Sequence, residues 1–229
     1  MKEQDLLKNA EIIGTTLARA AMDAAIYEHQ FDVVIVDEAS MCYVPQAAFA
    51  ASLGKKVIIC GDFKQLPPIA HSRAPLVTEW LKNDVFHAAG VASTVGEHTL
   101  HPHLVLLNEQ RRMHPDISSF TNKYVYRSLV HDHESVKSNR QMIIERKPFA
   151  NRASILLDTS FTGHYCINEK SSKSRWNPWQ LPISFQVMHE AYIGGARSIG
   201  YVTPYRVQAE MMNSLLDDFY PEEKIAGNM

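Results

Sequence analysis

Short apolar runs, separated by Ala-rich or Pro-initiated segments, give the chain an alternating pattern. Residues 17–27 are Ala-rich and favour a helix, and proline suits the first turn of helices at 45–52 and 204–216. Strands that alternate with helices are typical of βαβ units, so we predict an α/β fold with a parallel sheet. The apolar runs predict strands at residues 11–14, 31–37, 55–60, 104–107, 153–158 and 198–202.

The pattern of apolar and polar residues changes between residues 71 and 103 and indicates a mixed, helical connection. Such a connection suggests that the chain contains two domain pieces. It ends in a polar, His-rich segment at 96–103, which we interpret as a linker. His98, His101 and His103 suggest a metal site at first sight. No carboxylate or cysteine cluster shares their spacing, so we favour a solvated linker instead.

A carboxylate pair follows a run of four β-favouring residues, Val-Val-Ile-Val at 33–36. Open α/β sheets bind ligands at the carboxyl ends of their strands, where Asp37 and Glu38 would lie. There Asp37 can hold magnesium through water, and Glu38 can polarise the water that attacks a γ-phosphate. An acidic turn after a buried strand remains an alternative.

A second strand leads into Gly-Asp-Phe-Lys-Gln-Leu-Pro-Pro at residues 61–68. Gly61 permits a tight exit, and Asp62 and Gln65 are compact polar groups that can contact a phosphate or its water. Pro67 stiffens the end of this loop. An ordinary βα turn is the alternative, but a separation of about 24 residues from Asp37 is one βαβ step, so both strand ends would face one crevice.

Composition is that of an ordinary globular protein, with 45% hydrophobic and 21% charged residues. The formal net charge of −2, from 23 basic and 25 acidic residues, gives no global signature for nucleic acid. Three widely spaced cysteines predict a reducing compartment, the cytoplasm, or the nucleus in a eukaryote. No apolar stretch approaches the roughly 20 residues of a membrane span, so we expect no membrane partner.

Four segments resemble, in order, the motifs of superfamily 1 helicases, most closely the 5′-to-3′ branch that includes the nonsense-mediated-decay helicase. The segments are Asp-Glu-Ala-Ser at 37–40, Gly-Asp-Phe-Lys-Gln-Leu-Pro-Pro at 61–68, Glu-Gln-Arg-Arg-Met-His-Pro at 109–115 and Val-Thr-Pro-Tyr-Arg-Val-Gln at 202–208. With their flanks they span most of residues 10–215.

This resemblance implies parts of two RecA-like P-loop NTPase domains with parallel sheets. Residues 1–75 would be the C-terminal part of the first domain, 76–103 the helical connection, and 104–229 the N-terminal part of the second. The implied function is ATP-dependent translocation on, or unwinding of, single-stranded DNA or RNA, with ATP and Mg²⁺ as cofactors.

The resemblance also assigns roles to individual residues. Asp37 would bind magnesium, Glu38 would be the catalytic base, and Gln65 would sense the γ-phosphate. Arg112 would reach the γ-phosphate from the second domain and stabilise its charge. Arg111 stands where the family usually has tyrosine, so either guanidinium could serve, although alignment favours Arg112 and a salt-bridged surface arginine is the alternative for Arg111.

Nucleic-acid contacts are implied for Thr15, Thr16, Pro67, Thr203 and Tyr205. Threonine hydroxyls commonly meet backbone phosphates, and tyrosine can stack on a base or donate a hydrogen bond. A helix cap is the alternative role for the Thr15–Thr16 pair.

The 229 residues contain no Gly-x-x-x-x-Gly-Lys-Ser/Thr loop and none of the family's late motifs. We therefore expect a fragment whose phosphate loop lies on a separate chain or upstream segment, and which alone hydrolyses ATP negligibly. Two alternatives are a catalytically inactive nucleic-acid-binding or scaffold module and a different RecA-like nucleotide hydrolase that acts on protein assemblies.

Overall fold

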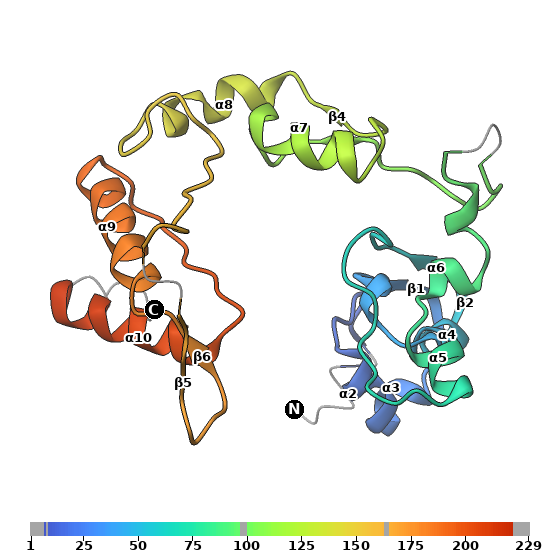
Figure 1. Ribbon diagram of the computed structural model, residues 1–229. Helices are drawn as coiled ribbons and strands as arrows, with labels where there is room; N and C mark the ends of the chain where they lie inside the picture. The colour runs from blue at the N-terminus through green and yellow to red at the C-terminus, as the bar shows by residue number, and fades with distance from the viewer. Residues whose placement is uncertain (1–6, 8, 97–99, 163–164, 222–229) are drawn as a thin grey trace. The chain divides into compact units, whose positions relative to one another are not determined.

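The computed structural model describes residues 7, 9–96, 100–162 and 165–221. The chain divides into two compact units, Met1–Leu106 and Leu107–Met229 (Figure 1). Each unit combines helices with one pair of parallel strands, and the second unit adds an antiparallel pair. The predicted α/β class with parallel strands is therefore confirmed.

The sheet of the first unit consists of β1 (Phe31–Val36) and β2 (Gly54–Ile59), which pair in parallel along their whole length. Both strands were predicted from their apolar runs. The hydrogen bonding continues past the strand ends, since Cys60 N donates to Val36 O at 2.8 Å and Ala39 N donates to Cys60 O at 2.9 Å. This extension holds the two loops that leave the sheet side by side.

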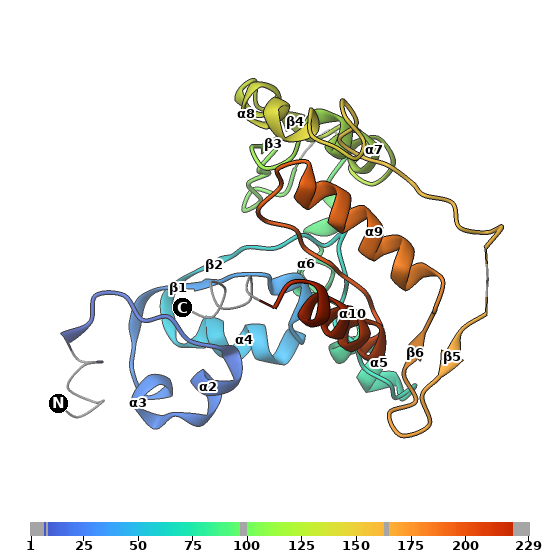
Figure 2. The ribbon, with the colours of Figure 1, turned by 90° about the vertical axis from the view of Figure 1, so that its left-hand side faces the viewer.

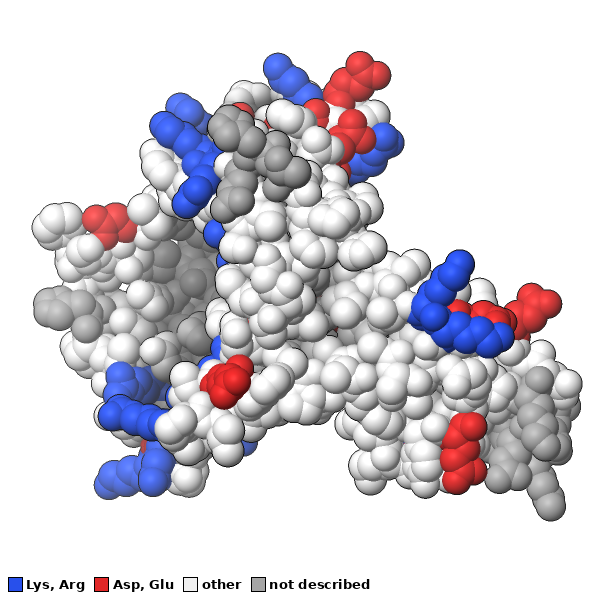
Figure 3. Space-filling view, turned by 90° about the vertical axis from the view of Figure 1, so that its right-hand side faces the viewer, with Lys and Arg blue, Asp and Glu red and all other residues white. Residues whose placement is uncertain are grey.

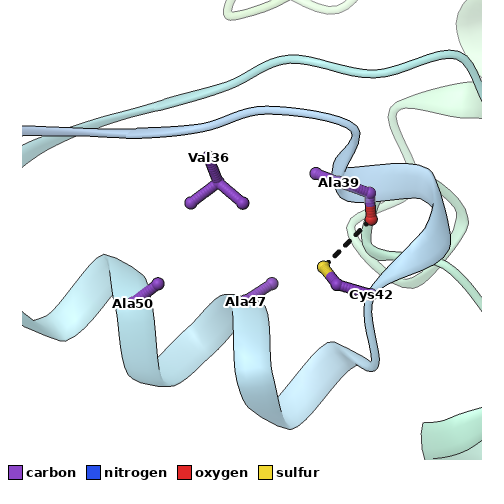
Figure 4. Packing of buried hydrophobic residues seen from close by; sticks show 5 residues of the cluster. All are labelled: Val36, Ala39, Cys42, Ala47 and Ala50. Atoms are coloured by element: carbon purple, nitrogen blue, oxygen red, sulfur yellow. Dashed lines mark hydrogen bonds between the residues drawn. The ribbon is translucent and has the colours of Figure 1, made fainter. Parts of the chain in front are cut away.

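Helix α4 (Val44–Ser52) connects the two strands and begins, as predicted, with a proline in its first turn. It packs against the end of β1 through a small apolar core. The Cys42 thiol donates to Ala39 O at 3.1 Å, and burial raises the pKa of this thiol, which keeps the proton that it donates (Figure 4). The core residues are Val36, Ala39, Cys42, Ala47 and Ala50.

The predicted helix at residues 17–27 is broken into α2 (Leu17–Met22) and α3 (Ala24–Tyr27). Asp23 has extended backbone and its carboxylate accepts from Ala25 N at 3.1 Å. Aspartate competes with helical hydrogen bonds in this way, which explains the break in an otherwise Ala-rich stretch.

Short helices fill the predicted connection between the domains. They are α5 (Pro75–Leu81), α6 (Val85–Ala88) and the 3-10 turn η2 (Ala92–Thr94), and a further 3-10 turn, η1 (Ala39–Met41), follows β1. His98 and its neighbours 97 and 99 in the predicted linker lie outside the described residues.

In the second unit, β3 (Glu109–Gln110) pairs in parallel with β4 (His131–Asp132), and α7 (Pro115–Tyr124) lies between them in the chain. Helix α8 (Ser135–Ile144) follows, then the antiparallel hairpin of β5 (Ile167–Asn168) and β6 (Arg175–Trp176).

Helices α9 (Gln180–Ile193) and α10 (Arg206–Phe219) close the second unit and lie side by side (Figure 2). The rings of Phe185 and Phe219 join them, with centroids 5.0 Å apart. Helix α10 was predicted from residue 204, but it begins two residues later because Tyr205 has extended backbone at the cap position.

Four strand predictions are wrong: the described residues at 11–14, 104–107, 153–158 and 198–202 form no strand. A strand is stabilised by pairing with a neighbouring strand, and within the described part of the chain these segments belong to no sheet. Their apolar side chains are exposed instead, as Leu156 at 92% and Val202 at 94% show.

Helix α7 begins at Pro115, and proline suits a first turn, but the apolar stripe that the sequence period predicts on this helix does not form a core. Ile117, Phe120 and Tyr124 are exposed, whereas Ser118 is the buried residue of the helix. The hydroxyl of Ser118 donates to Asp132 of β4, so the face of the helix that carries Ser118, and not the apolar stripe, faces β4. Among the described residues, no helix is both long enough and apolar enough to cross a membrane.

Candidate functional site

The two predicted carboxylates follow directly on β1 and are exposed. Glu38 has left-handed backbone, with φ 51° and ψ 36°, and its amide donates to Asp37 Oδ1 at 3.0 Å. The chain passes from the strand end at Val36 into η1 at Ala39 over these two residues, which requires a sharp turn. The turn leaves both carboxylates accessible at the carboxyl end of the sheet.

The loop after β2 approaches this turn closely because its second residue, Gly61, has no side chain. A Cβ on Gly61 would lie 3.0 Å from Ser40 N and 3.1 Å from Ala39 N, and 2.9 Å from a ring carbon of Phe86. A larger residue would push the two loops apart. The structure thus brings the strand end of Asp37 and the strand end of Gly61 to one edge of the sheet.

Asp62 organises the loop that carries the predicted glutamine. Its carboxylate accepts from Lys64 N at 3.0 Å and from Gln65 Nε2 at 2.8 Å, and its backbone oxygen accepts from Gln65 N at 3.0 Å. Gln65 remains exposed, and so does Pro67 two residues later. Tyr43 Oη donates to Ile69 O at 2.8 Å, which ties the end of this loop to the start of α4.

Thr15 and Thr16 lie beside β1 in the same unit. Thr16 caps α2, because its hydroxyl accepts from Arg19 N at 3.2 Å, so the cap alternative is confirmed for this residue. Thr15 is exposed and makes only a local contact among the described residues, with Thr16 O at 3.5 Å. Both threonines and Asp37 line one cavity of about 380 Å³ along β1.

In the second unit, Gln110 holds the loop of residues 111–114, which we call the arginine loop. Its Oε1 accepts from Arg112 N and Met113 N, both at 2.9 Å, and its Nε2 donates to Met113 O at 2.9 Å and to Asp132. The Asp132 carboxylate also accepts from Ser118 Oγ at 2.6 Å. This network joins β3, β4 and α7 around the backbone of Arg112.

The two adjacent arginines of this loop differ in their contacts. Arg111 is bound by Glu109, with Nη2 2.8 Å and Nε 3.0 Å from Oε1. Arg140 Nε donates to the backbone oxygen of Arg112 at 3.0 Å, but within the described residues no group pairs with the Arg112 guanidinium. Arg112 is therefore the arginine with a side chain available to a ligand.

His114 closes the loop as the cap of α7. Its Nδ1 accepts from Asp116 N at 3.2 Å, and the residue is 5% exposed. Because Nδ1 accepts, the neutral ring carries its proton on Nε2, which is buried and has no partner among the described residues. Gln110 and His114 belong to the recognised motif, whereas nothing in the sequence pattern pointed to Asp132.

Thr203 and Tyr205 lie immediately before α10, where Tyr205 N donates to Thr203 Oγ1 at 3.3 Å. Both line a cavity of about 490 Å³, which Trp176 of β6 also borders. Gln208 is buried in the first turn of α10, and its Oε1 accepts from Asn177 N at 2.7 Å. Gln208 therefore serves a structural role that joins the hairpin to α10.

Each group of Lys and Arg side chains on the face drawn in Figure 3 is small and is bordered by uncharged residues. Nucleic-acid contacts would therefore depend on local groups, as the net charge of −2 predicts. Within the described ranges, no three His, Cys, Asp or Glu side chains gather in a way that could hold a metal ion by themselves.

Parallel strands whose carboxyl ends carry carboxylates and a polar loop are typical of the nucleotide-binding α/β class. A family model described as an AAA domain matches residues 93–226, and a second AAA domain model matches residues 1–73. The first of these covers more than half of the chain, so the chain belongs to the AAA domain family.

The relatives confirm the resemblance to superfamily 1 helicases. The DNA-binding protein SMUBP-2 of Mesocricetus auratus is 25% identical over 234 residues, 96% of this chain and 22% of that protein. The DNA polymerase alpha-associated DNA helicase A of Schizosaccharomyces pombe is 29% identical over 203 residues, 82% of this chain and 28% of its own length.

An uncharacterized ATP-dependent helicase, MJ0104 of Methanocaldococcus jannaschii, is 31% identical over 134 residues, 58% of this chain and 18% of its own length. The chain thus spans between 18% and 28% of these three curated relatives. It is a superfamily 1 helicase-like sequence that corresponds to one part of such proteins.

Proposed function

We propose that these residues form part of the motor of a helicase that couples ATP hydrolysis to translocation on, or unwinding of, single-stranded DNA or RNA. The observation that carries the proposal is the meeting of two strand ends at one edge of the sheet. Asp37 and Glu38 leave β1 there, and the loop of Gln65 leaves β2 beside them. The helicase names of the relatives support the same function.

Asp37 suits magnesium in this role. The ion keeps several waters and takes one or two carboxylates together with phosphate oxygens, so a cluster of three protein ligands is not required. Asp37 is exposed and follows the strand end, so a carboxylate oxygen is available. When bound, the ion would neutralise phosphate charge.

Glu38 is the proposed base, and its exposed carboxylate would orient and polarise a water for attack on the γ-phosphate. Gln65 is held by Asp62 through one amide proton. Its amide oxygen and second N–H proton are then free to contact that water or a phosphate oxygen. Glu38 would accept the proton of the attacking water, and Gln65 would position that water.

Arg112 is the proposed stabiliser of the phosphoryl group. Within the described residues the Arg112 guanidinium has no carboxylate partner, so its charge is available to an anionic ligand, whereas Glu109 offsets the charge of Arg111. Such a contact acts on charge that develops in the transition state and can be worth orders of magnitude in rate.

For the nucleic acid, we assign backbone contacts to Thr15, Thr16, Pro67, Thr203 and Tyr205. The cap at Thr16 uses only the oxygen of the hydroxyl as acceptor, so the O–H proton remains available to a phosphate oxygen. Such an ATP-driven motor would work in the cytoplasm, or in the nucleus of a eukaryote.

A second candidate is a nucleic-acid-binding or scaffold module without catalysis. The observation that favours it is that Thr15, Thr203 and Tyr205 line cavities of about 380 and 490 Å³, where contacts to a strand would need no nucleotide. Under the first proposal, a further segment or a separate chain supplies the phosphate loop.

ATP hydrolysis by the natural polypeptide that contains these residues tests the proposal. We expect hydrolysis that requires Mg²⁺ and is stimulated by single strands, that Glu38→Gln abolishes while nucleotide binding persists, and that the exposed control Glu79→Gln leaves unchanged. The isolated 229-residue chain should hydrolyse ATP negligibly. Hydrolysis that survives Glu38→Gln would contradict the assignment, and single-strand binding without any hydrolysis would favour the second candidate.

A further inference from the structure

The hairpin of β5 and β6 carries a tip that is ordered by one carboxylate. Glu169 accepts from Ser171 N at 3.0 Å, Ser171 Oγ at 2.6 Å and Ser172 N at 2.5 Å. Two backbone bonds close the turn, from Glu169 N to Ser174 O at 2.9 Å and from Lys173 N to Glu169 O at 3.0 Å. These donors lower the pKa of Glu169 to about 2, so the tip keeps the same bonds at neutral pH.

Three cations surround this tip, Lys170, Lys173 and Arg175, and all are exposed. Within the described residues none of them pairs with a carboxylate, whereas Arg111 and Arg206 elsewhere in the unit do. Glu169 is the acidic residue of the hairpin, and its oxygens face the serine donors. The hairpin therefore presents uncompensated positive charge on a fixed backbone.

The hairpin is joined to the segment that carries Thr203 and Tyr205. Val207 N donates to Ser174 Oγ at 3.3 Å, and Asn177 N donates to the buried Gln208 at 2.7 Å. Both contacts involve the first turn of α10, which follows Tyr205 directly. The positive charge of the hairpin is thus held in a fixed relation to two proposed nucleic-acid residues.

Aromatic surface accompanies this charge. Trp176 follows Arg175 on β6 and is partly exposed, and it lines the cavity of about 490 Å³ together with Thr203 and Tyr205. Basic groups that track phosphates, next to aromatic rings on which bases stack, are the combination by which proteins bind single strands without sequence preference.

We propose that the β5–β6 hairpin is a second contact for single-stranded nucleic acid, in which Lys170 and Lys173 bind backbone phosphates beside the Thr203–Tyr205 segment. The inference rests on the proposed function and adds to it a binding element that lies outside the recognised motifs. An acidic protein segment would use the same charges, but it has no run of bases to stack on the aromatic rings, so we favour the nucleic acid.

The salt dependence of binding gives a direct test. Each phosphate neutralised on a single strand contributes roughly 0.7 to the slope of log K against log salt concentration. The Lys170→Gln/Lys173→Gln variant should therefore lower the slope by about 1.4, measured with fluorescent 20-nucleotide oligo-dT and oligo-U between about 50 and 200 mM salt. The control variant Lys123→Gln/Lys137→Gln, on α7 and α8, should leave the slope unchanged.

The outcomes separate the two proposals. An unchanged slope in the hairpin variant, with binding by the wild-type chain intact, overturns the hairpin contact and leaves the proposed function standing. A wild-type chain that binds neither oligonucleotide overturns both. Equal binding of poly-glutamate, lost in the same variant, would show a general anion surface and overturn the nucleic-acid assignment. Thermal unfolding checks that the variant is folded, and two exposed lysines without ion pairs should leave its midpoint unchanged.

Discussion

The two parallel strand pairs position their candidate residues by different means. β1 and β2 pair over six residues each, and an apolar core on α4 fixes the turn of Asp37 and Glu38. β3 and β4 contain two residues each, and the loop of Arg112 depends on hydrogen bonds from side chains.

This difference predicts which changes each region tolerates. Buried apolar side chains stabilise the β1–β2 pair. Truncation of a buried apolar residue there should therefore lower the free energy of unfolding, whereas substitution of an exposed polar residue should change it little. Few, partly exposed polar contacts hold the second pair, so loss of one acceptor should loosen its loop at a smaller total cost. The two regions should therefore respond to opposite kinds of substitution.

The largest effect is expected for Val36→Ala in the core of the first unit. Val36 is 4% exposed, so loss of two methyl groups plus the cavity should reduce the free energy of unfolding by about 2.5 kcal/mol. Val33→Ala on the same strand, at 47% exposure, should cost less than half as much. Urea unfolding measures both, and equal losses would mean that the core does not hold this strand pair.

Gly61→Ala should follow, with a loss of about 1.5 kcal/mol, because the new Cβ meets two backbone amides. Gly14→Ala is the matched control in the same unit, since nothing lies within 4 Å of its Cβ. The same unfolding measurement compares them. If both variants were equally stable, the close approach of the two loops would be disproved.

In the second unit, Asp132→Ala should cost about 1 kcal/mol, because Gln110 and Ser118 lose an acceptor. Amide hydrogen exchange at Arg112 and Met113 should accelerate about fivefold to tenfold, whereas exchange within α10 should not change. Asp132→Asn keeps an acceptor oxygen and should restore slow exchange. Protection that survives Asp132→Ala would show that Gln110 holds the loop without help.

The smallest effect is expected at the exposed pair of Asp32 and Lys55, whose side chains meet at 2.7 Å. The hydrogen bond and charge of Lys55 lower the pKa of Asp32, so any stabilisation is present above the ordinary aspartate value of 3.8 and is lost as pH falls through the lowered pKa. Asp32→Asn should remove that acid limb of the stability profile and little else. A large loss at pH 7 would contradict the solvent-exposed character of the pair.

Sequence patterns predicted the elements whose contacts lie close together in the sequence. β1, α4 and β2 follow one another along the chain, so each strand pairs with a strand that is separated from it by a single helix. The starts of α4, with Pro45 in its first turn, and of α7, at Pro115, were also predictable, because proline at a first turn needs no tertiary partner. The motif residues followed from the order of four segments rather than from any single one.

The failures concern contacts between distant residues. The apolar runs at 153–158 and 198–202 have the composition of strands, but composition does not supply a neighbour to pair with. The bond from Gln110 to Asp132 spans 22 residues and depends on a two-residue strand pair that no periodicity indicates. The stripe on α7 was mistaken for core because periodicity marks an apolar face and not what covers it.

The left-handed backbone of Glu38 lowers the stability of the fold at the position that carries the proposed catalytic base. Relief of the positive φ by glycine would gain about 1–2 kcal/mol, from which the freer unfolded chain removes about 0.4–1 kcal/mol. Glu38→Gly should thus be slightly more resistant to urea than the natural sequence while it lacks the carboxylate. With Glu38 in its proposed role as base, selection for thermal stability alone would favour an inactive protein, so stabilised versions of this chain should keep residue 38 fixed.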